Sequence, residues 1–429
     1  MKNLIIAIIL LTVINSNAQQ TPAPKQTEPI TIEGATAHLG NGTVIENSLI
    51  MFSEGKLTFV GSANMKIARI GKVINAEGKH IYPGFIAPNS TLGLTEIDAV
   101  RATRDADEVG MMNPHIRSLI AYNTESKVVE SMRPNGVLMA QITPRGGRIS
   151  GTSSIVQLDA WNWEDAVIKE NDGIHLNWPS TYSRGRWWLG EPNVLTENKK
   201  YIEQLDAVIH FFAEAKAYKE NNNSNKHQPF DALLELVKGN RTLYIHADYE
   251  KELIDALNFT EENDIKNVVI VGGYEANNIA DVLKTKNIPV LLQRVHSRPN
   301  NSDDDYDLPF KLANQLVSAG VLVGLENAGD MERMNTRNLP FLAGTCAAYG
   351  LDKEVALSLI TLNTAKILGI DKTTGSLEVG KDATLFISQG DALDMRTNIL
   401  EHAFIQGRDI SLETHQTELY KRYSKKLEK

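Results

Sequence analysis

Cysteine is almost absent from this sequence. Cys346 is the only one among 429 residues, so an intramolecular disulfide is excluded. It lies in an apolar stretch at residues 341–348 with helical spacing, which favours a buried structural thiol over a catalytic nucleophile. Disulfide bonds and thiol catalysis are therefore not expected to carry the fold or the function.

An excess of positive charge is absent as well. The formal net charge is −9, and basic residues cluster only near the C-terminus, at Lys421-Arg422 and Lys425-Lys426. Binding to the phosphate backbone of a nucleic acid therefore has no electrostatic support. The sequence also contains no Gly-x-Ser-x-Gly nucleophile elbow and no complete phosphate-binding loop motif.

Apolar runs long enough to span a bilayer are missing too. The longest run, residues 4–14, follows Lys2 and is followed by the small residues Ser16-Asn17-Ala18, which is typical of a secretory signal. We expect a signal peptide at residues 1–18 and an exported protein, periplasmic or extracellular, that has no membrane contact after cleavage. An uncleaved membrane anchor is the alternative.

The remaining chain divides by composition into five segments. Residues 19–29 are rich in Pro, Gln and Thr and predict a disordered leader. Residues 30–80 contain short alternating strands and turns, and residues 371–412 return to the same pattern, so both are expected to form one small β-sandwich. Residues 81–370 alternate strands with helices. Residues 413–429 form a C-terminal tail.

The long middle segment predicts a closed barrel. Apolar strands that alternate with amphipathic helices indicate a parallel sheet with helices outside it. Eight such strands suggest a (β/α)8 TIM-like barrel, which places its active site at the C-terminal ends of the strands. The expected strands are residues 81–86, 136–142, 154–158, 174–177, 242–247, 267–271, 288–293 and 321–326.

Two stretches stand out as motifs: Pro-Gly-Phe-Ile at residues 83–86, and residues 361–369 together with 375–383. They resemble the amidohydrolase superfamily, in its imidazolonepropionase-like branch. The first stretch is similar to the first barrel strand of that family, and the second is similar to the helix and turn that lead back to its small β-sandwich. The resemblance covers about residues 30–412. It implies a (β/α)8 barrel with a small sandwich built from the N- and C-terminal segments.

The resemblance also implies a chemistry. Members of the superfamily hydrolyse mostly C–N bonds of amides, cyclic imides and ureas, using one or two divalent metals that lower the pKa of a bound water. Most ligand positions are substituted in this chain. The first-strand pair is Asn89 and Thr91, the fourth-strand position is His175, the fifth is His246, the sixth is Gly272 and the eighth is Glu326.

Two hypotheses follow from the resemblance. The first is a hydrolase of non-peptide C–N bonds that holds one divalent metal, most readily zinc, with His175, His246 and Glu326, where Glu326 is also the catalytic base. The second is a non-catalytic pseudoenzyme without metal, which binds a small ligand or a partner, as a homo-oligomer or together with a related amidohydrolase. In either case the substrate or ligand is expected to contact Asn89, Thr91, Arg294 and His296.

Overall fold

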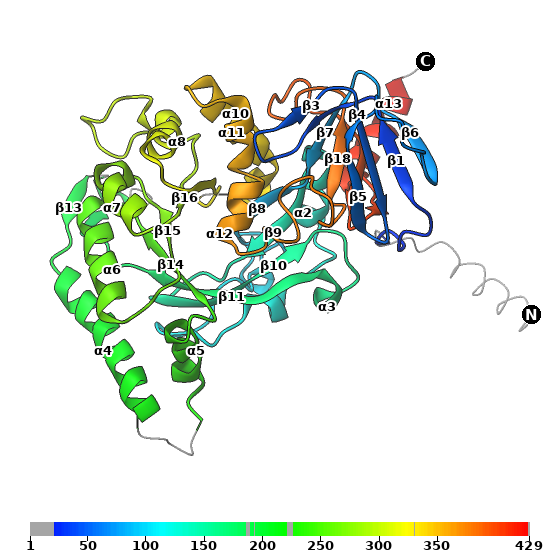
Figure 1. Cartoon of the computed structure of the whole chain (residues 1–429). Coiled ribbons are helices and arrows are strands. Elements are labelled where there is room, and N and C mark those ends of the chain that lie inside the picture. The colour runs from blue at the N-terminus through cyan, green and yellow to red at the C-terminus, as the bar shows by residue number, and fades with distance from the viewer. Residues whose placement is uncertain (1–20, 186–188, 193, 221–225, 330, 428–429) are drawn as a thin grey trace, which may run out of the picture.

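Figure 1 shows the whole chain of the computed structural model, which describes residues 21–185, 189–192, 194–220, 226–329 and 331–427. The expected signal peptide lies outside the described residues. Across the part of the chain that is described, no helix has both the length and the apolar character needed to cross a bilayer.

The small domain is built from both ends of the chain, as predicted. One sheet has the order β5-β4-β1-β6 and the other the order β20-β19-β18-β7-β2-β3. Apolar side chains of both sheets share one core, which includes Ile32, Phe52, Ile81, Leu385 and Phe404. In Figure 1 blue N-terminal strands meet the orange β18 on the right. The strands are β1 (Ile30–Glu33), β2 (Thr36–His38), β3 (Val44–Ile45), β4 (Ser48–Ser53), β5 (Lys56–Ser62), β6 (Lys72–Asn75), β7 (His80–Pro83), β18 (Leu385–Ser388), β19 (Leu400–Ile405) and β20 (Arg408–Asp409).

The larger domain contains the predicted eight-stranded barrel sheet, in the order β17-β16-β15-β14-β11-β10-β9-β8. The sheet is not wholly parallel, because β10 runs antiparallel to both β9 and β11. Short connections explain this difference, since a parallel pair needs a long crossover and an antiparallel pair does not. The strands are β8 (Phe85–Ser90), β9 (Val137–Ile142), β10 (Ile149–Gln157), β11 (Val167–Asn177), β14 (Thr242–Ala247), β15 (Val268–Gly272), β16 (Val290–Leu292) and β17 (Val323–Leu325).

The predicted first barrel strand is divided between the two domains. β7 pairs with β18 in the small domain, whereas β8 pairs with β9 in the barrel. Gly84 lies at the crossing, and its N–H donates to the carbonyl of Thr384. An added Cβ at Gly84 would lie 2.9 Å from a methyl group of Thr384 and 3.0 Å from one of Leu138. The crossing therefore requires glycine, and it places the end of β8 at the barrel mouth.

The barrel is closed through a segment outside its eight strands. The N–H of Leu325 in β17 donates to the carbonyl of Leu359, and the N–H of Ile86 in β8 donates to the carbonyl of Ile360. The helix that follows, α12 (Leu362–Ile367), contributes apolar side chains to the interior core that contains Ile86. These contacts fill one end of the barrel, so a polar site has room only toward the other end.

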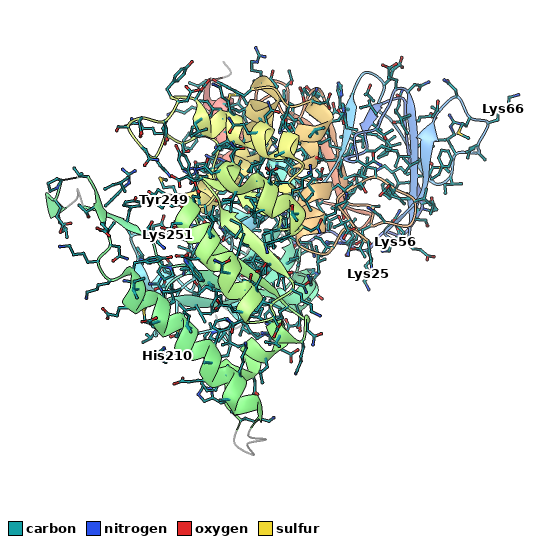
Figure 2. The ribbon with its side chains drawn as sticks, turned by 60° about the vertical axis from the view of Figure 1, so that its left-hand side comes forward. Lys25, Lys56, Lys66, His210, Tyr249 and Lys251 are labelled. Atoms are coloured by element: carbon teal, nitrogen blue, oxygen red, sulfur yellow. The ribbon has the colours of Figure 1, made fainter. Side chains whose placement is uncertain are left out.

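Amphipathic helices cover the outside of the sheet. The outward residues Ile245 and Ile270 share a core with Leu253, Leu283 and Leu316 from three of these helices. In Figure 1 the green α4 and α5 project at the lower left, and in Figure 2 His210 marks the exposed side of α4. The longer helices are α4 (Tyr201–Glu220), α5 (Gln228–Val237), α6 (Glu250–Glu262), α7 (Ala280–Thr285), α8 (Leu308–Ala319), α10 (Leu339–Ala348), α11 (Lys353–Ser358) and α13 (His415–Leu427).

Short elements complete the described structure. The hairpin β12 (Tyr182–Arg184) and β13 (Leu195–Glu197) forms a separate two-stranded sheet. The remaining helices of one or two turns are α2 (Lys127–Glu130), α3 (Trp163–Ala166), α9 (Glu332–Asn335), η2 (Arg101–Thr103), η3 (Ser118–Ala121), η4 (Arg133–Asn135), η6 (Ala276–Ile279) and η7 (Thr336–Asn338).

The described part of the predicted disordered leader is held against both domains. The N–H of Ala23 donates to Asp159 at 2.9 Å, and Arg408 donates to the carbonyl of Ala23 at 3.2 Å. Gln26 donates to the carbonyl of Phe52 at 3.1 Å. Composition favours disorder here, but these partners lie far along the chain and satisfy the backbone of an extended segment. Figure 2 shows Lys25 beside Lys56 at this junction.

Candidate active site

The interior of the barrel brings the two predicted metal-ligand histidines together. Residues two apart on a strand share one face, and Tyr244 of β14 belongs to the interior core, so His246 also points inward. In the parallel pairing of β11 with β14, His175 lies opposite Tyr244. The rings of His175 and Tyr244 stack with centroids 4.6 Å apart and an interplanar angle of 7°.

His175 and His246 bond directly to each other. Nδ1 of His175 lies 2.9 Å from Nε2 of His246, and His175 is fully buried. Burial, and then the charge of Arg145, lowers the pKa of His246 to about 3. Burial, and then His246 and Arg145, lowers the pKa of His175 well below its usual range. Both rings are therefore neutral at pH 7, and one shared N–H joins them.

Glu326 follows β17 and lies elsewhere in the same interior. Its Oε2 accepts from Nδ2 of Asn89 at 3.1 Å and from the N–H of Ala328 at 2.6 Å, and the residue is 3% exposed. Burial raises the pKa of Glu326 to about 7, and the charge of Glu332 adds to this effect. The bonds from Ala328 and Asn89 and the charge of Arg145 lower it in part. At neutral pH this carboxyl is divided between its two protonation states.

Arg145 places a positive charge at the same end of the barrel. Its Nη1 donates to Oδ1 of Asn89 at 2.9 Å, and its Nη2 donates to the carbonyl of Asn89 at 2.8 Å and to Glu332 at 2.7 Å. Glu332 also accepts from the hydroxyl of Thr91 at 2.7 Å. Asn89 has a positive φ of 49°, a conformation that asparagine tolerates better than most residues. Asn89 and Thr91 are thus bonded to Arg145 and Glu332.

A second buried network lies beneath Asn89. The N–H of Asn89 donates to Gln141 at 2.9 Å, and Gln141 donates to Asp172 at 2.8 Å. Asp172 also accepts from the hydroxyl of Tyr244 at 2.6 Å and forms an ion pair with Lys169 at 2.6 Å. Because the ring of Tyr244 stacks on that of His175, this network positions the histidine pair.

A polar pocket of about 360 Å³ opens beside Arg145 and Glu332 at the barrel mouth. The two hydroxyls of Thr91 and Thr95 line it, together with charged side chains of both signs. Three of these are guanidinium groups and three are carboxylates: Arg104, Arg145, Arg333, Asp98, Asp107 and Glu332. A small polar molecule in this pocket would contact Arg145 and Glu332, and Arg145 in turn bonds to Asn89, the partner of Glu326.

The four predicted substrate contacts separate into two groups. Asn89 and Thr91 lie in the Arg145 network, and Thr91 lines the pocket. Arg294 donates to the carbonyl of Asn327 at 3.1 Å, which keeps it near the end of β17. His296 is exposed, and its Nε2 lies 2.7 Å from the hydroxyl of Thr345 in α10. This contact directs His296 toward an outer helix.

The structure gives only part of the predicted metal-ligand set. Within the residues it describes, no three His, Cys, Asp or Glu side chains lie together as metal ligands. His175 and His246 are together, but Glu326 is bonded to Asn89 and Ala328. A catalytic zinc ordinarily has three protein ligands and one open position. The sixth-strand ligand position is Gly272 on β15, and the side chains that β15 directs into the interior core are those of Val269 and Val271, which cannot bind a metal.

Sequence reasoning missed Arg145 and Glu332. Residues 145–151 have the composition of a glycine-rich turn, so Arg145 was not among the predicted site residues, and neither was Glu332. The available signal was the position of Arg145 just after β9, because residues that follow barrel strands line the mouth. Its N–H donates to the carbonyl of Ala106, which fixes the turn against the preceding loop segment.

Comparisons with known proteins agree with this architecture. The amidohydrolase family matches residues 312–410. An imidazolonepropionase of Flavobacterium johnsoniae is 20% identical over 94% of this chain and the whole of that protein. A second imidazolonepropionase, from Flavobacterium psychrophilum, is 27% identical, but only over 24% of this chain and 27% of its own length.

Further relatives extend the comparison. A 5-methylthioadenosine/S-adenosylhomocysteine deaminase of Thermoanaerobacter pseudethanolicus is 23% identical over 80% of this chain and 81% of that protein. The crystal structure of an amidohydrolase from Thermotoga maritima superposes with a TM-score of 0.76 at 23% identity, covering 89% of this chain and 99% of the other. The fold is that of the superposed amidohydrolase structure. In sequence, the chain is similar to the amidohydrolase family over residues 312–410 and to imidazolonepropionase at low identity over most of its length.

Proposed function

We propose that this protein is an exported hydrolase of a non-peptide C–N bond with a depleted metal site. The observation that carries the proposal is that Asn89 links the buried Glu326 to Arg145, which lines a polar pocket, while the pair His175–His246 lies in the same barrel interior. Barrel enzymes place catalysis at this end of their strands. Ionisable groups with displaced pKa values are enriched at functional sites. Similarity to a deaminase supports cleavage of a C–N bond.

The donors that this chain presents do not fit a metal site of the usual kind. His175 and His246 direct ring nitrogens at each other, and Glu326 is bonded to two N–H donors. The charge of Arg145 opposes that of a metal cation in the same interior. A divalent metal, if one binds, has two imidazoles as its nearest donors. No step of the proposed reaction passes through a metal.

The residues present supply acid–base chemistry. As the carboxylate, Glu326 takes a proton from water while the water oxygen bonds to the carbon of the substrate C–N group. Glu326 then returns that proton to the nitrogen as the C–N bond breaks, so the net reaction consumes one water. Arg145 stabilises the negative charge that develops on the substrate oxygen or nitrogen. The pKa of Glu326, about 7, suits both transfers near neutral pH.

The test is turnover of amides, cyclic imides and acyl-amino acids by the chain from Gln19 onward. We expect Glu326→Gln to lose about 100-fold or more, the usual contribution of a general acid–base group. Glu203→Gln is the matched control, because Glu203 is exposed on helix α4 and belongs to no predicted site. Equal turnover by Glu326→Gln and wild type would show that Glu326 takes no part in the reaction.

The second candidate is a non-catalytic subunit that binds a ligand or a related amidohydrolase. The direct bond between His175 and His246 and the substitution of both first-strand positions favour it. It predicts no turnover by wild type, with ligand or partner binding that His246→Ala leaves unchanged. Metal analysis of both proteins, purified without chelator, separates the candidates further: stoichiometric metal in wild type and none in the variant would exclude a metal-free subunit.

A further inference from the structure

The C-terminal helix α13 presents an exposed apolar stripe. Tyr420, Tyr423 and Leu427 lie three, four and seven residues apart, a spacing that places them on one face of a helix. Their exposed fractions are 75%, 62% and 82%, and no residue of α13 is buried. Side chains of this size are seldom left in water as a row without a partner.

The opposite face of α13 is basic. Four Lys and Arg residues against one Glu give residues 415–427 a formal charge of +3, whereas the whole chain carries −9. The rest of the chain therefore carries −12, so α13 is a positive element on an acidic protein. Its basic residues are Lys421, Arg422, Lys425 and Lys426.

The helix contacts the described body of the protein mainly at its start. The N–H of His415 donates to Glu130 at 2.8 Å, and the N–H of Thr417 donates to the hydroxyl of Thr414 at 3.2 Å. Farther along, Lys421 is paired with Glu413, which lies just before the start of α13. A helix of 13 residues is marginal in water by itself. A surface that covers the apolar stripe would stabilise it.

We propose that α13 docks on an anionic membrane surface. The basic face matches the negative charge of such a surface, and tyrosine side chains favour the level of the lipid headgroups. A short basic helix with aromatic and leucine residues on its other face is typical of helices that lie in the membrane interface. The contact is peripheral and does not depend on the proposed hydrolase activity. It differs from the expectation that the mature chain has no membrane contact.

The experiment uses the chain from Gln19 onward, so that the expected signal peptide does not contribute. Co-sedimentation is measured with vesicles of phosphatidylcholine alone and with 40% phosphatidylglycerol. We expect binding to the anionic vesicles that is at least about tenfold stronger than to the neutral ones and that weakens as salt rises. Tyr420→Ser with Tyr423→Ser and Leu427→Ser removes the stripe, and Lys421→Glu with Lys425→Glu reverses the charge.

Each variant set should lower binding to anionic vesicles about tenfold or more. The matched control is Glu203→Gln, an exposed change on the distant helix α4, which should bind like wild type. Absence of vesicle binding would overturn the proposal and leave an acidic protein surface as the partner to seek. Equal binding to neutral and anionic vesicles, or full binding by either variant set, would also overturn it. All of these variants lie on exposed positions, so a comparison of their melting temperatures with wild type checks folding independently.

Discussion

The buried carboxyl of Glu326 should make the stability of this protein depend on pH in a specific direction. Burial raises its pKa from 4.5 to about 7 in the folded chain. The folded state therefore binds a proton more tightly than the unfolded state does. The stability linked to this proton is fully present below pH 4.5 and is lost as the pH rises through about 7.

The magnitude follows from the two pKa values. A difference between 4.5 and about 7 corresponds to about 3 kcal/mol, because each pH unit is worth about 1.4 kcal/mol. Glu326→Gln removes this loss, since glutamine does not ionise. The change preserves geometry, because Asn89 and Ala328 both donate to the same oxygen, Oε2, and an amide oxygen can accept both bonds.

Urea unfolding of wild type and Glu326→Gln at pH 5, 6, 7 and 8 tests this reasoning. We expect the free energy of unfolding of the variant, relative to wild type, to rise by about 2.5 kcal/mol between pH 5 and pH 8, which is most of the full difference. Glu203→Gln is the control, because the side chain of Glu203 is exposed on α4 and the same comparison should stay flat. If the difference in free energy of unfolding between Glu326→Gln and wild type stays constant across these pH values, the raised pKa of Glu326 is refuted.

Three further predictions address the neighbours of Glu326 and the leader. Burial lowers the pKa of His246 to about 3, so the stability linked to its neutral ring is complete above pH 6.5 and is lost as the pH falls. His246→Gln should therefore resist acid unfolding better than wild type. Equal acid sensitivity of the two proteins would count against a buried ring. Arg145→Met should lower the melting temperature, because it leaves the buried Glu332 without its guanidinium partner. Arg145→Lys should restore only part of the lost melting temperature. A melting temperature of Arg145→Met equal to that of wild type would be inconsistent with the network. Deletion of residues 19–26 should destabilise the chain by about 2 kcal/mol in urea, through the lost bonds of Ala23 and Gln26, whereas a truly disordered leader would be removable without effect.

The sequence predicted the barrel well because its signals are local. Apolar strand runs such as residues 242–247 and 267–271 reappear as β14 and β15 with nearly the same bounds. The first strand was predicted less well. A single apolar run at residues 81–86 is divided at Gly84 between two sheets, and periodicity alone contains no mark of that division.

Connection length explains the other error in the fold. The sequence suggested that every barrel strand runs parallel, but β10 is antiparallel to both neighbours. Residues 145–151 were interpreted as a glycine-rich turn, whereas the connection is residues 143–148 and β10 begins at Ile149. Its consequence for strand direction was not drawn, although so short a connection cannot return the chain for a parallel pair.

What the sequence by itself determined is the type of fold: the barrel, the small β-sandwich, and the strand and turn motifs that are similar to those of the amidohydrolase superfamily. Each of these depends on residues close together in the chain. Tertiary structure decided which of the remaining polar groups meet. His175 and His246 are 71 residues apart and Asn89 and Glu326 are 237 apart, and both pairs form only when the barrel closes. The position of Arg145 between Asn89 and Glu332, like the pKa of Glu326, depends on that closure, because burial and charge are properties of the packed interior.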